Sequence, residues 1–168
     1  MNNDWTGLLG VAAVLAGAGF IFFTVWKRSR GEAAVKAAQQ AVSYPLRLQA
    51  AERMILFLER IKPQNLLTRI NAADLSPTEL QQLILREVRT EFDHNAAQQL
   101  YLGKETWKKI SSAATATSAA LVHAIAEQAG KTGTRETIVY LLQNEDETAR
   151  TLIEEAIGAI KDEVQENF

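Results

Sequence analysis

The distribution of apolar and charged residues divides the chain into an apolar N-terminal segment and a longer mixed segment. Residues 5–26 contain no charged side chain, and a tryptophan stands at each end. About 20 apolar residues are enough to cross a bilayer as a helix, and tryptophan favours the membrane–water interface. The pattern therefore predicts a transmembrane helix over 5–26, preceded by a short external N-terminus over 1–4.

The charges that flank this stretch predict its orientation. Asp4 precedes it, whereas Lys27, Arg28 and Arg30 follow it. Cytoplasmic flanks of membrane helices carry the excess of Lys and Arg, so we expect the N-terminus outside and the remainder in the cytoplasm. A cleaved secretory signal would carry its basic residues before the apolar core, and we therefore favour an uncleaved anchor.

One face of the predicted membrane helix carries small side chains at Gly10, Ala13 and Gly17. Such a face lets the backbone of another membrane helix approach closely, which predicts association with a membrane protein or with a second copy. Glycine and alanine are also common in membrane helices without specific packing, so this alternative stays open.

The remaining sequence predicts an all-α fold, because its apolar residues follow the helical repeat and never alternate as in strands. Residues 27–44 form a basic flank and an alanine-rich stalk, which either continues the membrane helix or acts as a solvated spacer. Residues 45–168 are expected to form a cytoplasmic bundle of about six helices. These helices are expected over 46–61, 63–70, 77 to at least 92, 104–128, 134–144 and 147–165.

A second membrane span is not expected. Residues 110–126 are uncharged, but 111–120 consist only of Ser, Ala and Thr. Such side chains drive membrane insertion poorly. This stretch is therefore interpreted as a soluble helix that packs tightly against its neighbours.

The helix expected over 46–61 is apolar around more than a full turn and should lie at the centre of the bundle. Its charges gather on one arc around Leu56, formed by Gln49, Glu52, Arg53, Glu59 and Arg60. Glu52, Arg53 and Arg60 have no opposite charge three or four residues away. Any ion pairs that they form must therefore reach another helix or another protein. Pairing within the domain, with Leu56 partly covered, is the favoured interpretation, and a partner-binding surface is the alternative.

Composition excludes several functions. The chain has 18 Lys and Arg against 20 Asp and Glu, a formal charge of -2, which argues against nucleic acid as a partner. The absence of cysteine removes disulfides, thiolate catalysis and cysteine-based metal sites. Only two histidines remain for metal binding or acid–base chemistry.

The remaining candidates for chemistry are weak. Glu91 and His94 have the spacing of di-iron bundle ligands, but the second such pair is missing around His123. His94 is therefore expected at a helix end or in packing contacts, and His123 in the core. The stretch 130–132, Gly-Lys-Thr, resembles the end of a phosphate-binding loop, but the required earlier glycine is absent, and it is interpreted as a turn. We therefore expect no catalytic residue, metal or cofactor.

Several strings resemble those of a family of uncharacterised bacterial proteins of similar length. These are LRLQAAERM at 46–54, LFLERI at 56–61, Pro63 with NLL at 65–67, EF-HN at 91–95, QQLY at 98–101, Trp107 and IK-EV at 160–164. The resemblance implies one N-terminal membrane helix followed by a cytoplasmic helical domain. It implies no activity, cofactor or partner.

These features together favour a bitopic protein of the bacterial inner membrane. We expect a non-catalytic accessory or scaffold subunit of a membrane assembly, with residues 5–26 in the lipid bilayer. One alternative is an enzyme whose site is assembled around Glu91, His94 and Asn95. Another is a sensor that docks on anionic lipid surfaces.

Overall fold

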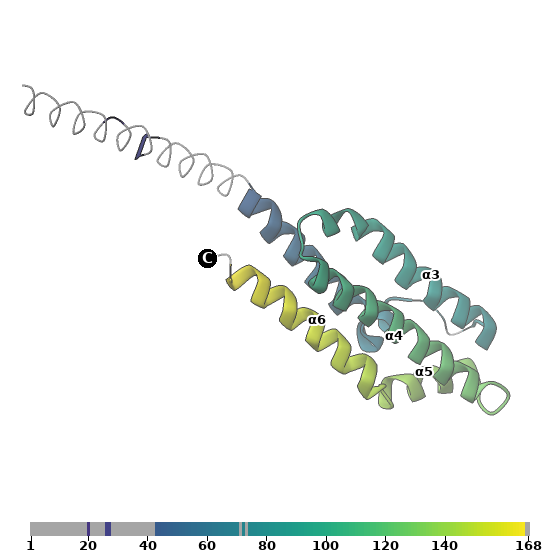
Figure 1. Cartoon of the computed structure of the whole chain (residues 1–168). Coiled ribbons are helices and arrows are strands. Elements are labelled where there is room, and N and C mark those ends of the chain that lie inside the picture. The colour runs from purple at the N-terminus through teal and green to yellow at the C-terminus, as the bar shows by residue number, and fades with distance from the viewer. Residues whose placement is uncertain (1–19, 21–25, 28–42, 71, 73, 167–168) are drawn as a thin grey trace, which may run out of the picture. The chain divides into compact units, whose positions relative to one another are not determined.

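The computed structural model describes residues 20, 26–27, 43–70, 72 and 74–166. Residues 43–61 are helical, and the following elements are α2 (Pro63–Arg69), α3 (Pro77–Asn95), the short 3-10 helix η1 (Ala96–Leu100), α4 (Lys104–Gln128), α5 (Thr134–Gln143) and α6 (Glu147–Gln165). Figure 1 shows these elements. The described part of the chain contains no strand, which confirms the predicted all-α class.

The chain forms two compact units, Met1–Pro45 and Leu46–Phe168. Most of the first unit lies outside the described residues, including Gly10, Ala13 and Gly17 and nearly all of the stretch predicted to cross the membrane. Among the helices in the described ranges, none is both long and apolar enough to span a bilayer.

The helix over 46–61, called the central helix below, is built into the core as the sequence predicts. Its fully buried side chains are Ala50, Met54, Leu58 and Ile61, with Ala51 and Phe57 almost fully buried. An aromatic chain links it to two neighbours. The Phe57 ring meets Phe92 of α3 at 5.7 Å between centroids, and Phe92 meets Trp107 of α4 at 5.4 Å.

Helix α4 packs along both α3 and α6, as Figure 1 shows. Its stretch of small residues contributes Ala113, Ala114 and Thr117 to the interior. The buried Thr117 hydroxyl donates to the Ala113 carbonyl at 2.9 Å, so its polar group is satisfied within the helix. The prediction that this stretch forms a helix that packs against its neighbours is therefore confirmed.

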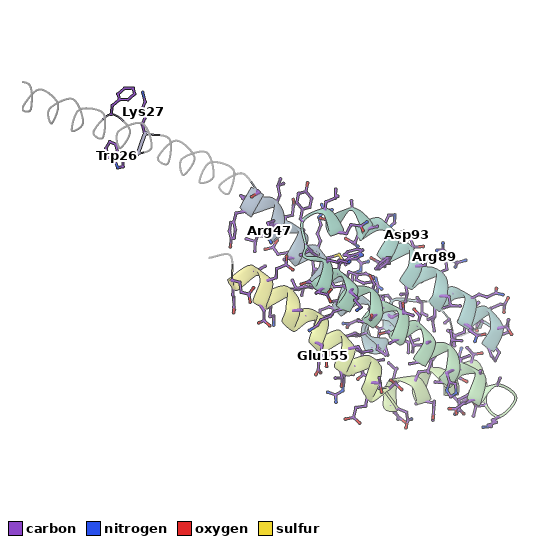
Figure 2. All side chains as sticks on the ribbon, viewed as in Figure 1. Trp26, Lys27, Arg47, Arg89, Asp93 and Glu155 are labelled. Carbon is purple, nitrogen blue, oxygen red and sulfur yellow. The ribbon has the colours of Figure 1, made fainter. Side chains whose placement is uncertain are left out.

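Arg47 connects the beginning of the central helix to the end of α6 through an ion pair with Glu163. Its Nη2 lies 3.2 Å from Oε1 of Glu163, and its Nε donates to the Tyr101 carbonyl at 3.3 Å. The same Glu163 oxygen accepts from the Gly103 amide at 2.8 Å. The Glu163 carboxylate thus connects the start of the central helix, the loop before α4 and the end of α6. Arg47 is labelled in Figure 2.

The turns follow the sequence signals closely. Proline begins α2 at its first position, and Gly130 after α4 has a φ of 75°, a conformation that glycine adopts without strain. The Gly-Lys-Thr stretch at 130–132 therefore lies in an interhelical turn, as expected. Helix α5 ends one residue earlier than predicted, at Gln143.

Helix α3 begins with a complete capping box. The Ser76 hydroxyl accepts from the Glu79 amide, and the Glu79 carboxylate accepts from the Ser76 amide at 2.8 Å and from its hydroxyl at 2.7 Å. These bonds to Ser76, led by the side-chain bond, lower the pKa of Glu79. A group with a depressed folded pKa stabilises the fold above its ordinary pKa and loses this effect as the pH falls.

Replacing Ser76 should therefore have a pH-dependent cost. We expect Ser76→Ala to lower the free energy of unfolding by about 1 kcal/mol at pH 7. The cost should shrink below about pH 4.3, the ordinary pKa of glutamate, because protonated Glu79 no longer gains from Ser76. Urea unfolding of the two proteins at several pH values measures this. Thr78→Ala, also exposed in the first turn, is the control, and an equal loss there would contradict the capping explanation.

Candidate functional site

The central helix exposes one arc of its surface. Gln49, Glu52, Arg53, Leu56 and Arg60 are exposed, while Glu59 is half-buried. Leu56 has 61% of its surface accessible, although it lies on the helix that contributes most to the core. We call Glu52, Arg53, Leu56, Glu59 and Arg60 the Leu56 surface.

The expectation that a neighbouring helix covers Leu56 is therefore wrong. The apolar run 54–58 does wrap around the helix, but only Met54, Phe57 and Leu58 are buried, and Ile55 is half-buried. The neighbouring helices pack against the opposite side, which leaves the middle of the charged arc open. An apolar side chain thus faces solvent within a ring of charges.

Two of the four charges on this surface pair within the domain. The Arg60 guanidinium lies 2.7 Å from the Glu91 carboxylate on α3. Lys62 Nζ lies 2.7 Å from the Glu59 carboxylate, three residues away. Arg60 and Glu59 are therefore held by ion pairs within the domain.

The other two charges have no such contact. Glu52 and Arg53 form no ion pair or side-chain hydrogen bond with any part of the chain that the structure describes. The expected pairing within the domain is thus correct for Arg60 and wrong for Arg53 and Glu52. Both unpaired side chains lie next to the exposed Leu56.

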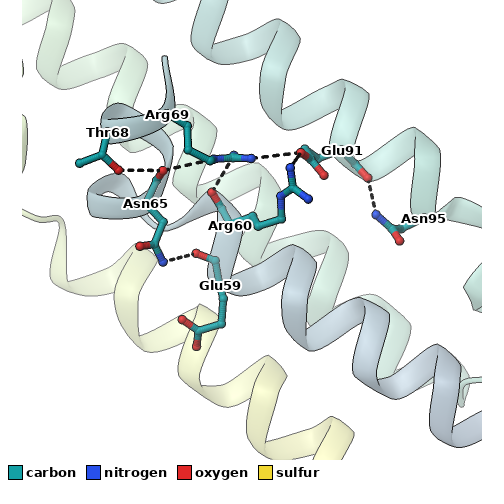
Figure 3. Close-up of polar contacts among 7 residues, drawn as sticks. All are labelled: Glu59, Arg60, Asn65, Thr68, Arg69, Glu91 and Asn95. Atoms are coloured by element: carbon teal, nitrogen blue, oxygen red, sulfur yellow. Dashed lines mark hydrogen bonds and ion pairs between the residues drawn. The ribbon is translucent and has the colours of Figure 1, made fainter. Parts of the chain in front are cut away.

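Glu91 is the centre of a polar network that fastens α3 to the end of the central helix, drawn in Figure 3. Its carboxylate accepts from Arg69 at 3.3 Å as well as pairing with Arg60, and its side chain is only 17% exposed. Arg69 also donates to the carbonyls of Arg60 and Asn65, at 3.1 and 3.2 Å. The Asn65 amide donates to the Glu59 carbonyl at 2.7 Å.

The three residues suggested for an enzyme lie together in the last turns of α3. The Glu91 carboxylate is engaged by two guanidinium groups. The Asn95 amide donates back to the Glu91 backbone carbonyl at 2.8 Å, and His94 is exposed in the last turn of α3. His94 therefore lies at a helix end, as the sequence predicts.

His123 is not a core residue, contrary to the expectation. Its side chain is 76% exposed, and Nδ1 lies 3.9 Å from the Glu127 carboxylate. The buried positions on this part of α4 are Leu121 and Ile125, two residues away on either side. Residues two apart point to nearly opposite sides of a helix, which places His123 outside. Within the described ranges, no three acidic or histidine side chains form a metal-binding group.

The sequence reasoning missed a pocket of about 470 Å³ bounded by α4, α5 and α6. Ala116, Ala120 and Ala124 contribute small side chains to its wall. Asp146 at its rim already caps α6, where its carboxylate accepts from the Ala149 amide at 2.7 Å. The alanine-rich pattern of α4 is the signal that could have indicated this hollow, because small side chains leave space beside a helix.

The Glu91 network generates a stability prediction. Glu91→Gln keeps the side-chain shape but removes the charge between two guanidinium groups, so it should lower the free energy of unfolding by about 1 to 2 kcal/mol. Urea unfolding measures the change. His94→Ala on the same helix should stay within about 0.5 kcal/mol, because that side chain is exposed. Equal effects of both variants would refute the structural role of Glu91.

Comparison with known proteins agrees with the resemblance noted in the sequence. No curated protein and no solved structure matches the chain. The model of a family of unknown function, DUF7935, matches residues 5–167, from the start of the apolar stretch almost to the C-terminus. The chain therefore belongs to the family of unknown function DUF7935.

Proposed function

We propose that this protein is a membrane-anchored, non-catalytic accessory or scaffold subunit of a membrane protein assembly. In this proposal the stretch 5–26 anchors the chain in the bacterial inner membrane, and the unit Leu46–Phe168 binds a protein partner in the cytoplasm. The observation that carries it is the Leu56 surface, where an exposed leucine is surrounded by charges on a helix whose opposite side is buried in the core.

The composition of this surface supports protein binding. Protein interfaces combine an apolar centre, which is desolvated on binding, with a polar rim that selects the partner. Leu56 provides the apolar centre. Arg60 and Glu59 are held at the rim by their pairs with Glu91 and Lys62, whereas Glu52 and Arg53 remain available for a partner.

The proposed anchor rests on the sequence and on two described residues. Phe20 and Trp26 are helical and expose 69% and 44% of their surfaces. Large exposed aromatic side chains are costly in water, and a surrounding bilayer would remove that cost. The basic residues after Trp26 favour an N-terminus outside and the helical unit inside.

The anchoring and the topology have a direct test. Carbonate washing should leave the full chain in the membrane fraction, since a charge-free span is held by the hydrocarbon core. A reporter that is active only in the cytoplasm should be active when fused to the C-terminus. A periplasmic reporter that is active at the same end would refute the topology, and extraction by carbonate would refute the anchor.

Partner binding is tested by truncating Leu56. Leu56→Ala should change the free energy of unfolding by less than about 0.5 kcal/mol, because the side chain is mostly exposed. It should nevertheless lower the recovery of associated protein on the tagged full chain purified in mild detergent. Leu85→Ala on α3, a leucine that is 44% exposed, is the matched control and should leave recovery unchanged. Equal recovery with Leu56→Ala and the wild type would eliminate this surface as the binding site.

A further inference from the structure

The charges of the Leu56 surface are sorted by sign along the helix. The pair Glu52-Arg53 recurs seven residues later as Glu59-Arg60. At about 100° per residue, both glutamates fall about 40° to 60° to one side of Leu56, and both arginines fall equally far to the other side. Leu56 therefore separates an acidic strip from a basic strip.

Gln49 extends the middle of this pattern. It lies seven residues before Leu56, about 20° from the same line along the helix, and it is exposed. Gln49 and Leu56 thus form a short exposed seam with one polar and one apolar position. This seam is narrower than that of a coiled coil, which has two apolar positions per heptad, but its flanking charges have the place of the e and g charges that select a partner helix.

The sorted charges distinguish between possible partners. When two copies of such a helix face each other in parallel about a two-fold axis, the acidic strip of each lies opposite the basic strip of the other. In the antiparallel arrangement each strip would face its own kind, and like charges would repel. The surface is therefore complementary to a parallel copy of itself.

We propose that the partner of the Leu56 surface is a second copy of this chain, packed in parallel with Leu56 against Leu56. Glu52 of each copy then lies beside Arg53 of the other, and Gln49 meets Gln49. The proposal rests on the function proposed above, in which this surface faces a partner. In the proposed function both copies are anchored with the same topology, so their helical units lie on the same side of the membrane.

The unpaired charges carry the selectivity of this arrangement. Glu52 and Arg53 have no ion-pair partner in the described part of the chain, so both are available to a second copy. Exposed ion pairs add little affinity but decide which orientation is accepted. One arc of one helix is smaller than the roughly 1,200 Å² that a stable interface buries, so the association should depend on the high effective concentration in a membrane.

Because the chain has no cysteine, single-cysteine variants report this contact without background. We expect Leu56→Cys and Gln49→Cys each to give a disulfide-linked dimer when membranes containing the full chain are mildly oxidised. A disulfide requires Cα atoms within about 7 Å. Only parallel helices in register bring position 49 close to position 49 of the other copy and, at the same time, position 56 close to position 56. Leu85→Cys, an exposed leucine on α3, is the control and should remain monomeric.

Charge exchange tests the complementarity of the strips. In the Leu56→Cys background, Glu52→Arg should lower the cross-linked fraction about five-fold, because it places arginine against Arg53 of the other copy. Adding Arg53→Glu should restore the cross-linked fraction to within about two-fold of the Leu56→Cys value, because the acidic and basic positions of the two copies then lie opposite each other again. Unchanged urea midpoints of these exposed variants show that folding is not the cause.

The outcomes separate this inference from the proposed function. No cross-linking at Leu56, together with Leu56-dependent recovery of a different protein, overturns the second copy and keeps the scaffold role. If the two single-cysteine variants are mixed and cross-links form only between Gln49→Cys and Leu56→Cys, the helices are antiparallel and the parallel arrangement is overturned. Absence of both cross-linking and Leu56-dependent recovery refutes both proposals.

Discussion

The central helix is the element on which the rest of the domain depends, because its large apolar face must be covered by other helices. Six of its side chains are buried or almost fully buried, and the rings of Phe57, Phe92 and Trp107 bring α3 and α4 against it. Removing such side chains from water supplies most of the favourable free energy of folding. The arc of this helix that no other described helix covers leaves Leu56 exposed to solvent.

Much of the fold could be predicted from the sequence, because helix boundaries are set by local chemistry. Ser76, Pro77 and Glu79 define the start of α3 through hydrogen bonds and backbone restriction within four residues, and the structure shows those same bonds. The limits of α4 and α6 agree with the prediction for the same reason. The central position of the 46–61 helix also follows from its composition, since a helix that is apolar around a full turn needs cover on several sides.

The candidate site was harder to predict, because it depends on which neighbours each side chain meets. The sequence showed that Arg60 had no local partner, but only the packing of α3 places Glu91 beside it. Periodicity identified the charged arc around Leu56 without revealing that no helix covers it. His123 was misassigned because the helix around it is rich in small apolar residues, and such a pattern does not define a buried side.

The contact between Arg47 and Glu163 has a mechanical consequence. Any tension along the chain from residues before 46 enters this domain at the start of the central helix. One guanidinium passes part of that load to α6 through Glu163, and the same carboxylate holds the Gly103 amide before α4. A pull from the N-terminal side would therefore act on the central helix, on α6 and on the loop before α4 together.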